Sequence, residues 1–261
     1  MFVFDSITHR LRHGCQTMAF PDGPPPALPD RHGGALRVDA AKCAAGCAAC
    51  VDVCPTQAIA KPAGGAVALD LGQCLFCAAC VEACPAHAIT QTNDHRMAVR
   101  RREDLLLGRP GGETLRLAAA LDEKSKKLFG HSLRLRQVSA GGCGACEADT
   151  NVLGTIGWDL GRFGIQFVAS PRHADGLLIT GAISCNMKLA LEKTYAAVPS
   201  PKIIIAVGAC AIAGGPFAGH PQVLNGAGAV VPVDLFVPGC PPHPLTILDG
   251  LLRLLDRLEP Q

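Results

Sequence analysis

The sequence has no excess of charge of either sign, since 18% of its residues are charged and the formal net charge is +2. This balance argues against a disordered tail and against a polybasic arm that binds nucleic acid. The chain also lacks a long uninterrupted apolar run. Its apolar segment 203–219 is broken by Gly208, Gly214, Gly215 and Pro216. We therefore expect no transmembrane segment.

Nucleotide-binding motifs are missing as well. No GxxxxGK[ST] sequence occurs and no GxGxxG opens an expected helix, which argues against ATP or NAD as a ligand. The first residues carry Asp5 and Arg10 and no apolar stretch that leads to a small-residue cleavage site, so they do not form a secretory signal. These absences predict a cytoplasmic protein.

Cysteine is what the sequence has in abundance, with 14 residues in 261. Because a reducing cytoplasm keeps thiols from pairing, so many cysteines predict metal binding rather than disulfides. Eight of them belong to two similar blocks: three lie in CAACVDVCPTQAI at residues 47–59, three lie in CAACVEACPAHAI at residues 77–89, and one more precedes each of these stretches. The similarity of the blocks indicates an internal duplication.

The second block has the CxxCxxCxxxCP spacing of bacterial two-cluster ferredoxins, in which three thiolates bind one cluster and the fourth reaches the other. The first block has one extra residue in its first gap, which Gly46 makes tolerable. Crossed ligation predicts one [4Fe-4S] cluster on Cys43, Cys47, Cys50 and Cys84, and another on Cys54, Cys74, Cys77 and Cys80. Structural zinc sites are the alternative, but these usually place a longer loop between two cysteine pairs.

Composition divides the chain into four parts. Residues 1–37 are rich in proline and glycine, which disfavours helix and predicts an extended lead-in. Residues 38–93 are expected to form a small α+β ferredoxin domain. Residues 94–130 are expected to be a helical connector, because apolar residues recur there at roughly helical spacing. The residues that set this spacing are Leu115, Ala118, Leu121 and Leu128.

Residues 131–261 alternate short apolar runs with helix-compatible segments, which predicts a parallel α/β sheet. The expected strands cover residues 133–138, 165–168, 177–180, 203–207 and 235–237, and the expected helices cover 150–163, 187–197 and 245–258. Cys143, Cys146, Cys210 and Cys240 each follow an expected strand. Since the carboxyl ends of parallel strands meet at one edge, four thiolates there can enclose one cubane, with glycines allowing close backbone approach.

The C-terminal part resembles the small subunit of membrane-associated, energy-converting [NiFe] hydrogenases, the family that includes the formate hydrogenlyase small subunit and, by fold, the 20 kDa subunit of complex I. The resemblance rests on GGCGACEAD, RFGIQFVASPRHADGLLITGAIS, PKIIIAVGACAIAGGPF and VDLFVPGCPPHP, which occur in the family order. It implies a flavodoxin-like sheet and gives Cys143, Cys146, Cys210 and Cys240 the role of holding a third [4Fe-4S] cluster beside the large subunit.

The N-terminal part, from MFVFDSITHRL to about residue 104, is similar to the separate ferredoxin-like subunit of formate hydrogenlyase. The chain therefore resembles a fusion of two electron-transfer subunits. Complex I subunits carry two adjacent cysteines where Gly144 and Ala145 here separate Cys143 from Cys146, which favours the hydrogenase branch. Cys15 and Cys185 are expected not to be ligands.

Three further residues are candidates for acting beside the third cluster. Arg172 and His173 lie in the PRHAD segment that matches the family, where charge or hydrogen bonding can tune a cluster; an ordinary salt bridge is the alternative. Asp149 stands where the family usually has glutamate, three residues after Cys146. It is a candidate for handling protons, with a solvated or helix-capping carboxylate as the alternative.

Together these patterns predict an electron-transfer subunit with three [4Fe-4S] clusters and no catalytic residue of its own. The resemblance implies a [NiFe] large subunit, membrane subunits, and a donor such as a formate dehydrogenase subunit or ferredoxin, at the cytoplasmic face of the inner membrane. One alternative is the equivalent subunit of a complex I-like or hydrogenase-related oxidoreductase without nickel, which reduces quinone or another acceptor. Another is a stand-alone ferredoxin-type carrier or redox sensor.

Overall fold

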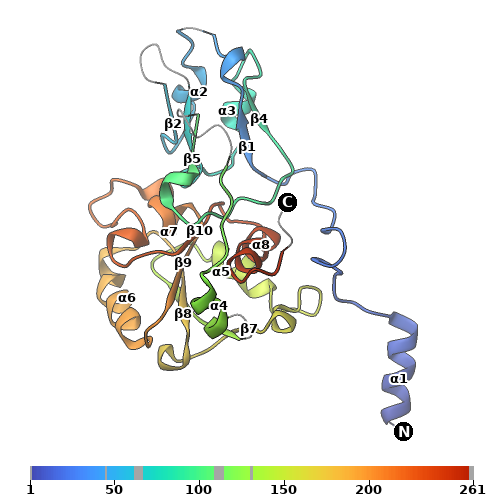
Figure 1. Ribbon diagram of the computed structural model, residues 1–261. Coiled ribbons are helices and arrows are strands. Elements are labelled where there is room, and N and C mark those ends of the chain that lie inside the picture. The colour runs from blue at the N-terminus through green and yellow to red at the C-terminus, as the bar shows by residue number, and fades with distance from the viewer. Residues whose placement is uncertain (1, 45, 62–66, 109–114, 130–131, 259–261) are drawn as a thin grey trace.

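Short antiparallel strands and two four-residue helices make up the N-terminal cysteine-rich module, which extends from β1 to β5 in the computed structural model (Figure 1). The structure describes residues 2–44, 46–61, 67–108, 115–129 and 132–258. One sheet pairs β1 with β4, and the other has the order β2-β3-β5. The elements are β1 (Leu36–Val38), η1 (Ala40–Lys42), α2 (Ala49–Asp52), β2 (Ile59–Ala60), β3 (Ala68–Asp70), α3 (Ala79–Glu82), β4 (Ile89–Gln91), η2 (Arg102–Leu105) and β5 (Leu106–Leu107).

The C-terminal α/β module is built on a five-stranded, wholly parallel sheet of order β10-β9-β8-β6-β7. Counted within the module this is the order 2-1-3-4-5 of flavodoxin-like folds, which confirms the predicted fold class. The strands are β6 (Leu133–Ser139), β7 (Ile165–Phe167), β8 (Gly176–Thr180), β9 (Ile203–Val207) and β10 (Leu235–Val237). The helices are α5 (Ala145–Val152), η3 (Leu160–Phe163), η4 (Pro171–His173), α6 (Cys185–Ala197), α7 (Ala209–Ala213), η5 (Gly215–Phe217), η6 (Ala227–Ala229) and α8 (Pro244–Leu254).

Burial explains why the central strands form continuous apolar runs. Every residue of β8 and β9 is buried, because both faces of the sheet are covered. One face packs against α8, which begins with Pro244 at its first turn and is capped by the imidazole of His243 accepting from the backbone N–H of Leu245 (3.1 Å). The sheet thus provides a rigid frame for the loops at its carboxyl edge.

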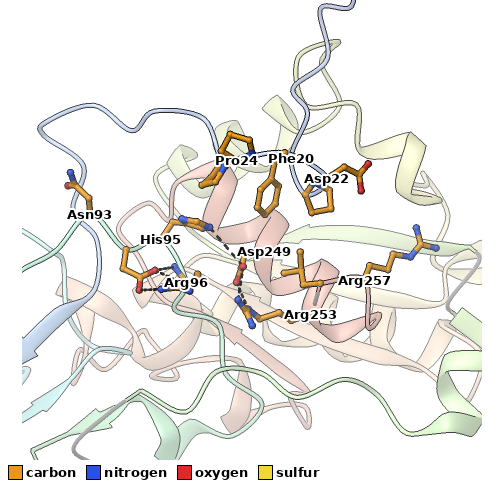
Figure 2. Close-up of a pocket in the computed structure, with 14 residues that line it drawn as sticks. Phe20, Asp22, Pro24, Asn93, His95, Arg96, Asp249, Arg253 and Arg257 are labelled. Carbon is orange, nitrogen blue, oxygen red and sulfur yellow. Dashed lines mark hydrogen bonds and ion pairs between the residues drawn. The ribbon is translucent and has the colours of Figure 1, made fainter. Parts of the chain in front are cut away.

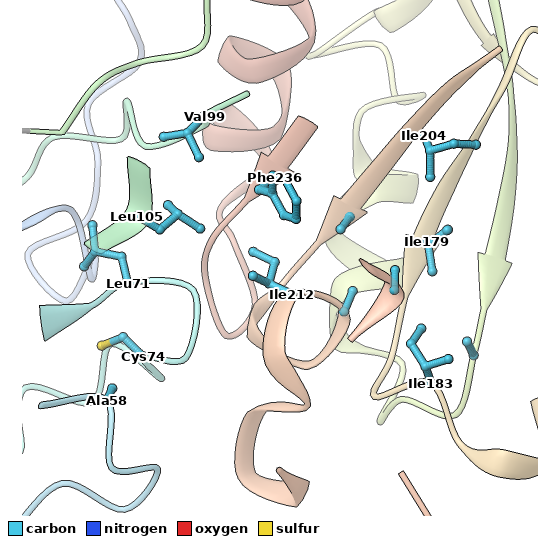
Figure 3. Close-up of a cluster of buried hydrophobic side chains, with 14 of the residues drawn as sticks. Ala58, Leu71, Cys74, Val99, Leu105, Ile179, Ile183, Ile204, Ile212 and Phe236 are labelled. Atoms are coloured by element: carbon cyan, nitrogen blue, oxygen red, sulfur yellow. The ribbon is translucent and has the colours of Figure 1, made fainter. Parts of the chain in front are cut away.

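The two modules share a hydrophobic cluster, drawn in Figure 3. Leu71 and Leu105 of the cysteine-rich module lie on one side of it, and Ile212 and Phe236 of the α/β module lie on the other. Val99 bridges them through paired backbone hydrogen bonds with Phe236, 3.0 and 2.9 Å long. This continuous packing fixes the cysteine-rich module above the β10 side of the sheet (Figure 1).

Three of the sequence-based expectations for secondary structure are corrected. Residues 2–13 are not extended: they form α1 (Phe2–His13), which projects away from both modules (Figure 1). Every proline of the lead-in lies at or beyond Pro21, so the average composition of 37 residues concealed a proline-free first segment. Within it, the exposed side chains of Phe4, Ile7 and Leu11 recur at helical spacing.

The expected helical connector is the second correction. Residues 115–122 have no helix, and α4 covers only Glu123–Phe129. The backbone N–H groups of Ala118 and Leu121 donate to Ala98 and Leu254 rather than to a preceding turn, and both side chains are buried. The apolar spacing therefore reflects an extended segment lying against the α/β module. Among the described helices, none is long and apolar enough to cross a membrane.

The expected helix at residues 150–163 is also displaced. Helix α5 begins at Ala145, directly after Gly144 in the left-handed region (φ 87°), and ends at Val152. Gly154 and Gly157 follow it, and only the short η3 covers the end of the expected range. This earlier start places Cys146 in the first turn of the helix.

Candidate iron–sulfur sites

The first cysteine group lines one cavity of the cysteine-rich module. Cys43, Cys47, Cys50 and Cys84 all border this cavity. Burial raises the pKa of the Cys50 thiol, and the charges of Cys43, Cys84 and Cys47 raise it further, which places the four sulfurs within electrostatic reach of one another. Cys84 comes from the other block, as the crossed pattern requires.

The second group lines a separate cavity with the reciprocal composition. Cys54 from the first block joins Cys74, Cys77 and Cys80 from the second. Burial, together with the charges of Cys80, Cys54 and Cys77, raises the pKa of the Cys74 thiol to about 12. Each cavity is thus bordered by one of the two sets of four cysteines that crossed ligation predicts.

The duplication extends to the backbone around the last cysteine of each block. The backbone N–H of Ala58 donates to Cys54 Sγ, and that of Ala88 donates to Cys84 Sγ, both at 3.2 Å. The intervening Gln57 and His87 occupy equivalent left-handed conformations, with φ of 54° and 48°. Each turn thus directs a donor at a sulfur, and hydrogen bonds to ligand sulfurs are one way a protein adjusts a cluster.

The third group gathers at the carboxyl edge of the parallel sheet. Cys143 and Cys146 follow β6, Cys210 follows β9 and Cys240 follows β10. Burial raises the pKa of the Cys146 thiol to about 12, and the charges of Cys210, Glu147, Cys240 and Cys143 add to this. The four sulfurs therefore surround one place, next to the β6/β8 switch point where ligands of such sheets bind.

Two glycines allow this approach. A Cβ added to Gly208 would lie 2.5 Å from Cys146 Sγ, and Gly208 has a positive φ of 91°. A Cβ on Gly215 would lie 2.8 Å from Cys210 Sγ. At these two positions the sulfur occupies the space that a Cβ would need, so a larger side chain has no room.

The three groups of cysteines lie one after another in space. Burial raises the pKa of the Cys80 thiol to about 11, and the charges of Cys54, Cys77 and, to a smaller extent, Cys50 of the first group add to it, so the first group is a neighbour of the second. Cys240 lines one cavity together with Leu75 and Phe76, the two residues before Cys77, so the second group is a neighbour of the third. The modules are thus arranged so that the second group lies between the other two.

The donor chemistry fits iron–sulfur clusters. Burial raises the pKa of the Cys74 and Cys146 thiols to about 12, so these two stay protonated near neutral pH until a metal binds and displaces the protons. The cavities of the first two groups are otherwise lined mostly by alanine, valine, leucine and isoleucine. The sulfurs surround space rather than converge on a point: among the described residues, no three His, Cys, Asp or Glu side chains are placed to hold a single ion.

The structure corrects the expectation for Arg172 and His173. Both lie in η4, which precedes β8, whereas the four cysteines follow the carboxyl ends of their strands. The five residues of β8 span about 17 Å at the usual rise. Both residues lie at the opposite edge of the sheet, so neither is beside the third group. The match to the family in this segment did not reveal which edge it occupies.

Asp149 lies nearer to the cysteines. It is inside α5 rather than at its N-terminus, so it does not cap the helix. Burial raises the pKa of this carboxyl, and it borders a cavity of about 320 Å³ between the modules together with Cys240 and His243. Cys15 and Cys185 are exposed and do not border the cavities of the first two groups.

Two polar residues at the sites were missed from the sequence. Glu147 accepts a hydrogen bond from the Thr180 hydroxyl (2.6 Å); burial would raise its pKa, but bonds from Ser139 and Thr180 lower it overall. Lys61 donates to Cys43 Sγ at 3.3 Å. The duplication could have drawn attention to Lys61, because superposing the two blocks aligns this charged residue with the neutral Gln91.

A further cleft lies away from the cysteines, between the lead-in and α8 (Figure 2). Two of its arginines are paired with carboxylates: Arg253 binds Asp249 and Arg96 binds Asp94, each with a shortest contact of 2.8 Å. Phe20 from the lead-in stacks edge-on against His95. Of these contacts, the one between Phe20 and His95 attaches the lead-in to the segment that follows β4.

Comparison with known proteins agrees with both modules. Residues 143–254 match the family described as NADH ubiquinone oxidoreductase, 20 Kd subunit, and residues 35–85 match a 4Fe-4S dicluster domain. A subunit of the NADH-quinone oxidoreductase of Heliobacterium modesticaldum is 42% identical over 119 residues, which are 45% of this chain and 68% of that protein. The chain belongs to the NADH ubiquinone oxidoreductase 20 Kd subunit family.

The chain is also similar to a protein described as a probable hydrogenase subunit. The membrane-bound hydrogenase subunit mbhJ of Pyrococcus furiosus is 39% identical over 132 residues, covering 51% of this chain and 79% of that protein. A chain of the archaeal membrane-bound sulfane sulfur reductase aligns with a TM-score of 0.46 and 30% identity, over 52% of this chain and 75% of that chain. The present protein thus joins a 4Fe-4S dicluster ferredoxin domain to a 20 Kd subunit domain, as an iron–sulfur electron-transfer subunit of an oxidoreductase complex.

Proposed function

We propose that the chain is the electron-relay subunit of a membrane-associated, hydrogenase-type complex and holds three [4Fe-4S] clusters. The first would be bound by Cys43, Cys47, Cys50 and Cys84, the second by Cys54, Cys74, Cys77 and Cys80, and the third by Cys143, Cys146, Cys210 and Cys240. Such a cluster takes up and releases one electron at a time. The cysteine-rich module, near residues 38–93, and the α/β module, near residues 131–261, would be the two cluster-binding domains.

The observation that carries this proposal is that Cys240 lines one cavity together with Leu75 and Phe76, directly beside Cys77 in the chain. This shared cavity links the second group, in the cysteine-rich module, to the third group, in the α/β module. A stand-alone carrier has no need for a third site fixed against the first two by a shared apolar cluster, whereas a relay does. Val99, Phe236 and Ile212 hold the modules in that position.

The rim of the third group supports a large-subunit interface at that end. Cys143 and Cys240 are exposed, as are Gly141, Gly142 and Gly144 around them. A site that excludes water needs cover here, and a partner subunit would provide it. In this proposal electrons pass between a donor near the first group and a [NiFe] large subunit at the third. The donor would be a formate dehydrogenase subunit or ferredoxin.

The Cys-Gly-Ala-Cys spacing of Cys143 and Cys146 favours the hydrogenase branch of the family. The identity to a subunit of an NADH-quinone oxidoreductase supports a second candidate, in which the large partner lacks nickel and reduces a quinone. Either complex would place the chain on the cytoplasmic face of the inner membrane through membrane subunits.

Metal analysis of the native complex, purified without oxygen, tests the proposal. Three clusters predict about twelve iron atoms per copy of this chain in addition to those of its partners. Nickel in the same preparation supports the hydrogenase-type complex. Twelve iron atoms without nickel, from a host able to mature nickel enzymes, support the second candidate. Eight or fewer iron atoms on this chain contradict the three-cluster relay.

A further inference from the structure

Lys61 is held tightly beside the first cysteine group. It follows β2, and its Nζ donates to Cys43 Sγ (3.3 Å), to the Ala44 carbonyl (2.7 Å) and to the Cys47 carbonyl (2.9 Å). A lysine ammonium has three N–H donors, and each has an acceptor here. The charge is therefore fixed at the sulfur instead of moving freely in solvent.

The second group provides an internal comparison without such a charge. Gln91, the last residue of β4, is aligned with Lys61, and its side-chain Nε2 is buried without a hydrogen-bond partner. The sulfur of Cys74, the first cysteine of that group, accepts instead from the neutral backbone N–H of Phe76 (3.3 Å). The charges that act on Cys74 come from other cysteines. The two halves of the duplication thus differ in one cation.

Charge and hydrogen bonding at the ligand sulfurs are among the main determinants of a cluster's reduction potential. A fixed ammonium stabilises the form that carries one more electron, and charge-assisted hydrogen bonds are stronger than neutral ones.

We propose that Lys61 raises the reduction potential of the cluster bound by Cys43, Cys47, Cys50 and Cys84 above that of the cluster bound by Cys54, Cys74, Cys77 and Cys80. This inference rests on the proposed function. The first group is the one remote from the third, since the second lies between them. Between the first two clusters, Lys61 therefore favours the remote one as the place where a single electron rests.

A Lys61→Gln substitution tests the role of the charge. Glutamine is the residue found at the aligned position, and its amide can still donate to the Ala44 and Cys47 carbonyls. Redox titration of the full chain in its complex, followed by EPR, would show one of three components shifted to lower potential. We expect at least a tenfold change in the ratio of oxidised to reduced cluster, which is about 59 mV for one electron.

Two matched variants serve as controls. Lys61→Arg keeps a cation and is expected to leave that component within a twofold change of the ratio. Gln91→Met changes the aligned residue of the second block without a change of charge and should move no component. An unchanged potential in K61Q, an equal fall in K61R, or a shift of all three components would overturn the proposal.

Iron content separates this test from that of the proposed function. A wild-type chain with fewer than three clusters contradicts the relay itself. A wild-type chain with about twelve iron atoms and no shift in K61Q contradicts only the role of Lys61. If K61Q loses the iron of one cluster, the K61R titration decides: a potential equal to that of the wild type supports the proposal, and a fall overturns it.

Discussion

The thiol of Cys240, at the carboxyl end of β10, lies within electrostatic reach of Cys77 in the other module. The two residues are 163 positions apart in the sequence. Burial raises the pKa of the Cys240 thiol, and the charges of Cys143 and Cys77 raise it further, so the third group is influenced by its own member and by the neighbouring group. This proximity turns three separate cysteine sites into one series.

Gly208→Ala should remove the third cluster. The added Cβ would meet Cys146 Sγ at 2.5 Å, on a backbone whose φ of 91° already disfavours a side chain. Iron analysis should show a loss of about four atoms per chain. Gly228→Ala, where no atom lies within 4 Å of the new Cβ, should keep all of them. Full iron content in G208A would contradict the assignment of Cys146.

Phe236→Ala should destabilise the contact between the modules. Phe236 is 8% exposed and lies in the shared cluster of Figure 3. Removing a buried phenyl ring costs about 3–5 kcal/mol of the free energy of unfolding. Phe217, which is 50% exposed, serves as the matched control, and its alanine variant should stay within about 0.5 kcal/mol of the wild type. Denaturant titration compares the two variants, and equal losses would argue against the interface.

Acid should weaken the cap of α8. Burial lowers the pKa of His243 to about 4, so between roughly pH 6.5 and 4 the unfolded chain binds a proton that the folded chain does not. Stability is therefore expected to fall as the pH decreases across this interval. His243→Asn keeps a side-chain acceptor for the Leu245 N–H but does not titrate. Unfolding curves at pH 7.5 and 5.5 should differ less in H243N, and an identical difference would rule out His243 as a source.

Cys80→Ser should interrupt electron flow while sparing the partner. Cys80 belongs to the second group, which lies in the middle of the series, and Cys50 of the first group is close enough to affect its pKa. Activity of the complex driven by its physiological donor should fall to background. Activity with an artificial dye that acts at the large subunit should remain, because the third group is intact. Equal loss of both activities would mean that the cysteine-rich module is needed only for assembly.

The local sequence pattern was sufficient to predict those features that depend on neighbouring residues in the chain. The apolar runs of β9 and β10 gave their bounds directly, and the crossed sets of cysteines followed from the duplicated spacing. Where contacts between distant segments decide, the pattern misled. Ala118 and Leu121 are spaced as in a helix, yet their backbone groups bond to Ala98 and Leu254, which no local signal indicates.

The residues expected or found beside the cysteines also show that local sequence does not reveal contacts between distant segments. Lys61 reaches Cys43 across 18 positions, so its role depended on the fold of the duplicated block. Arg172 matched the family in sequence but lies before β8, at the edge opposite the cysteines. Similarity identified the segment correctly, and only the strand direction showed that it is remote from the site.

EPR of the fully reduced chain tests the central claim most directly, namely that three clusters form one series with the second in the middle. In the wild type, each cluster signal should be broadened by spin–spin interaction with its neighbour. In C80S, which removes the middle cluster, the signals of the first and third should both remain and become independent of each other. Three independent signals in the wild type, or a first and third cluster that still interact in C80S, would contradict the series.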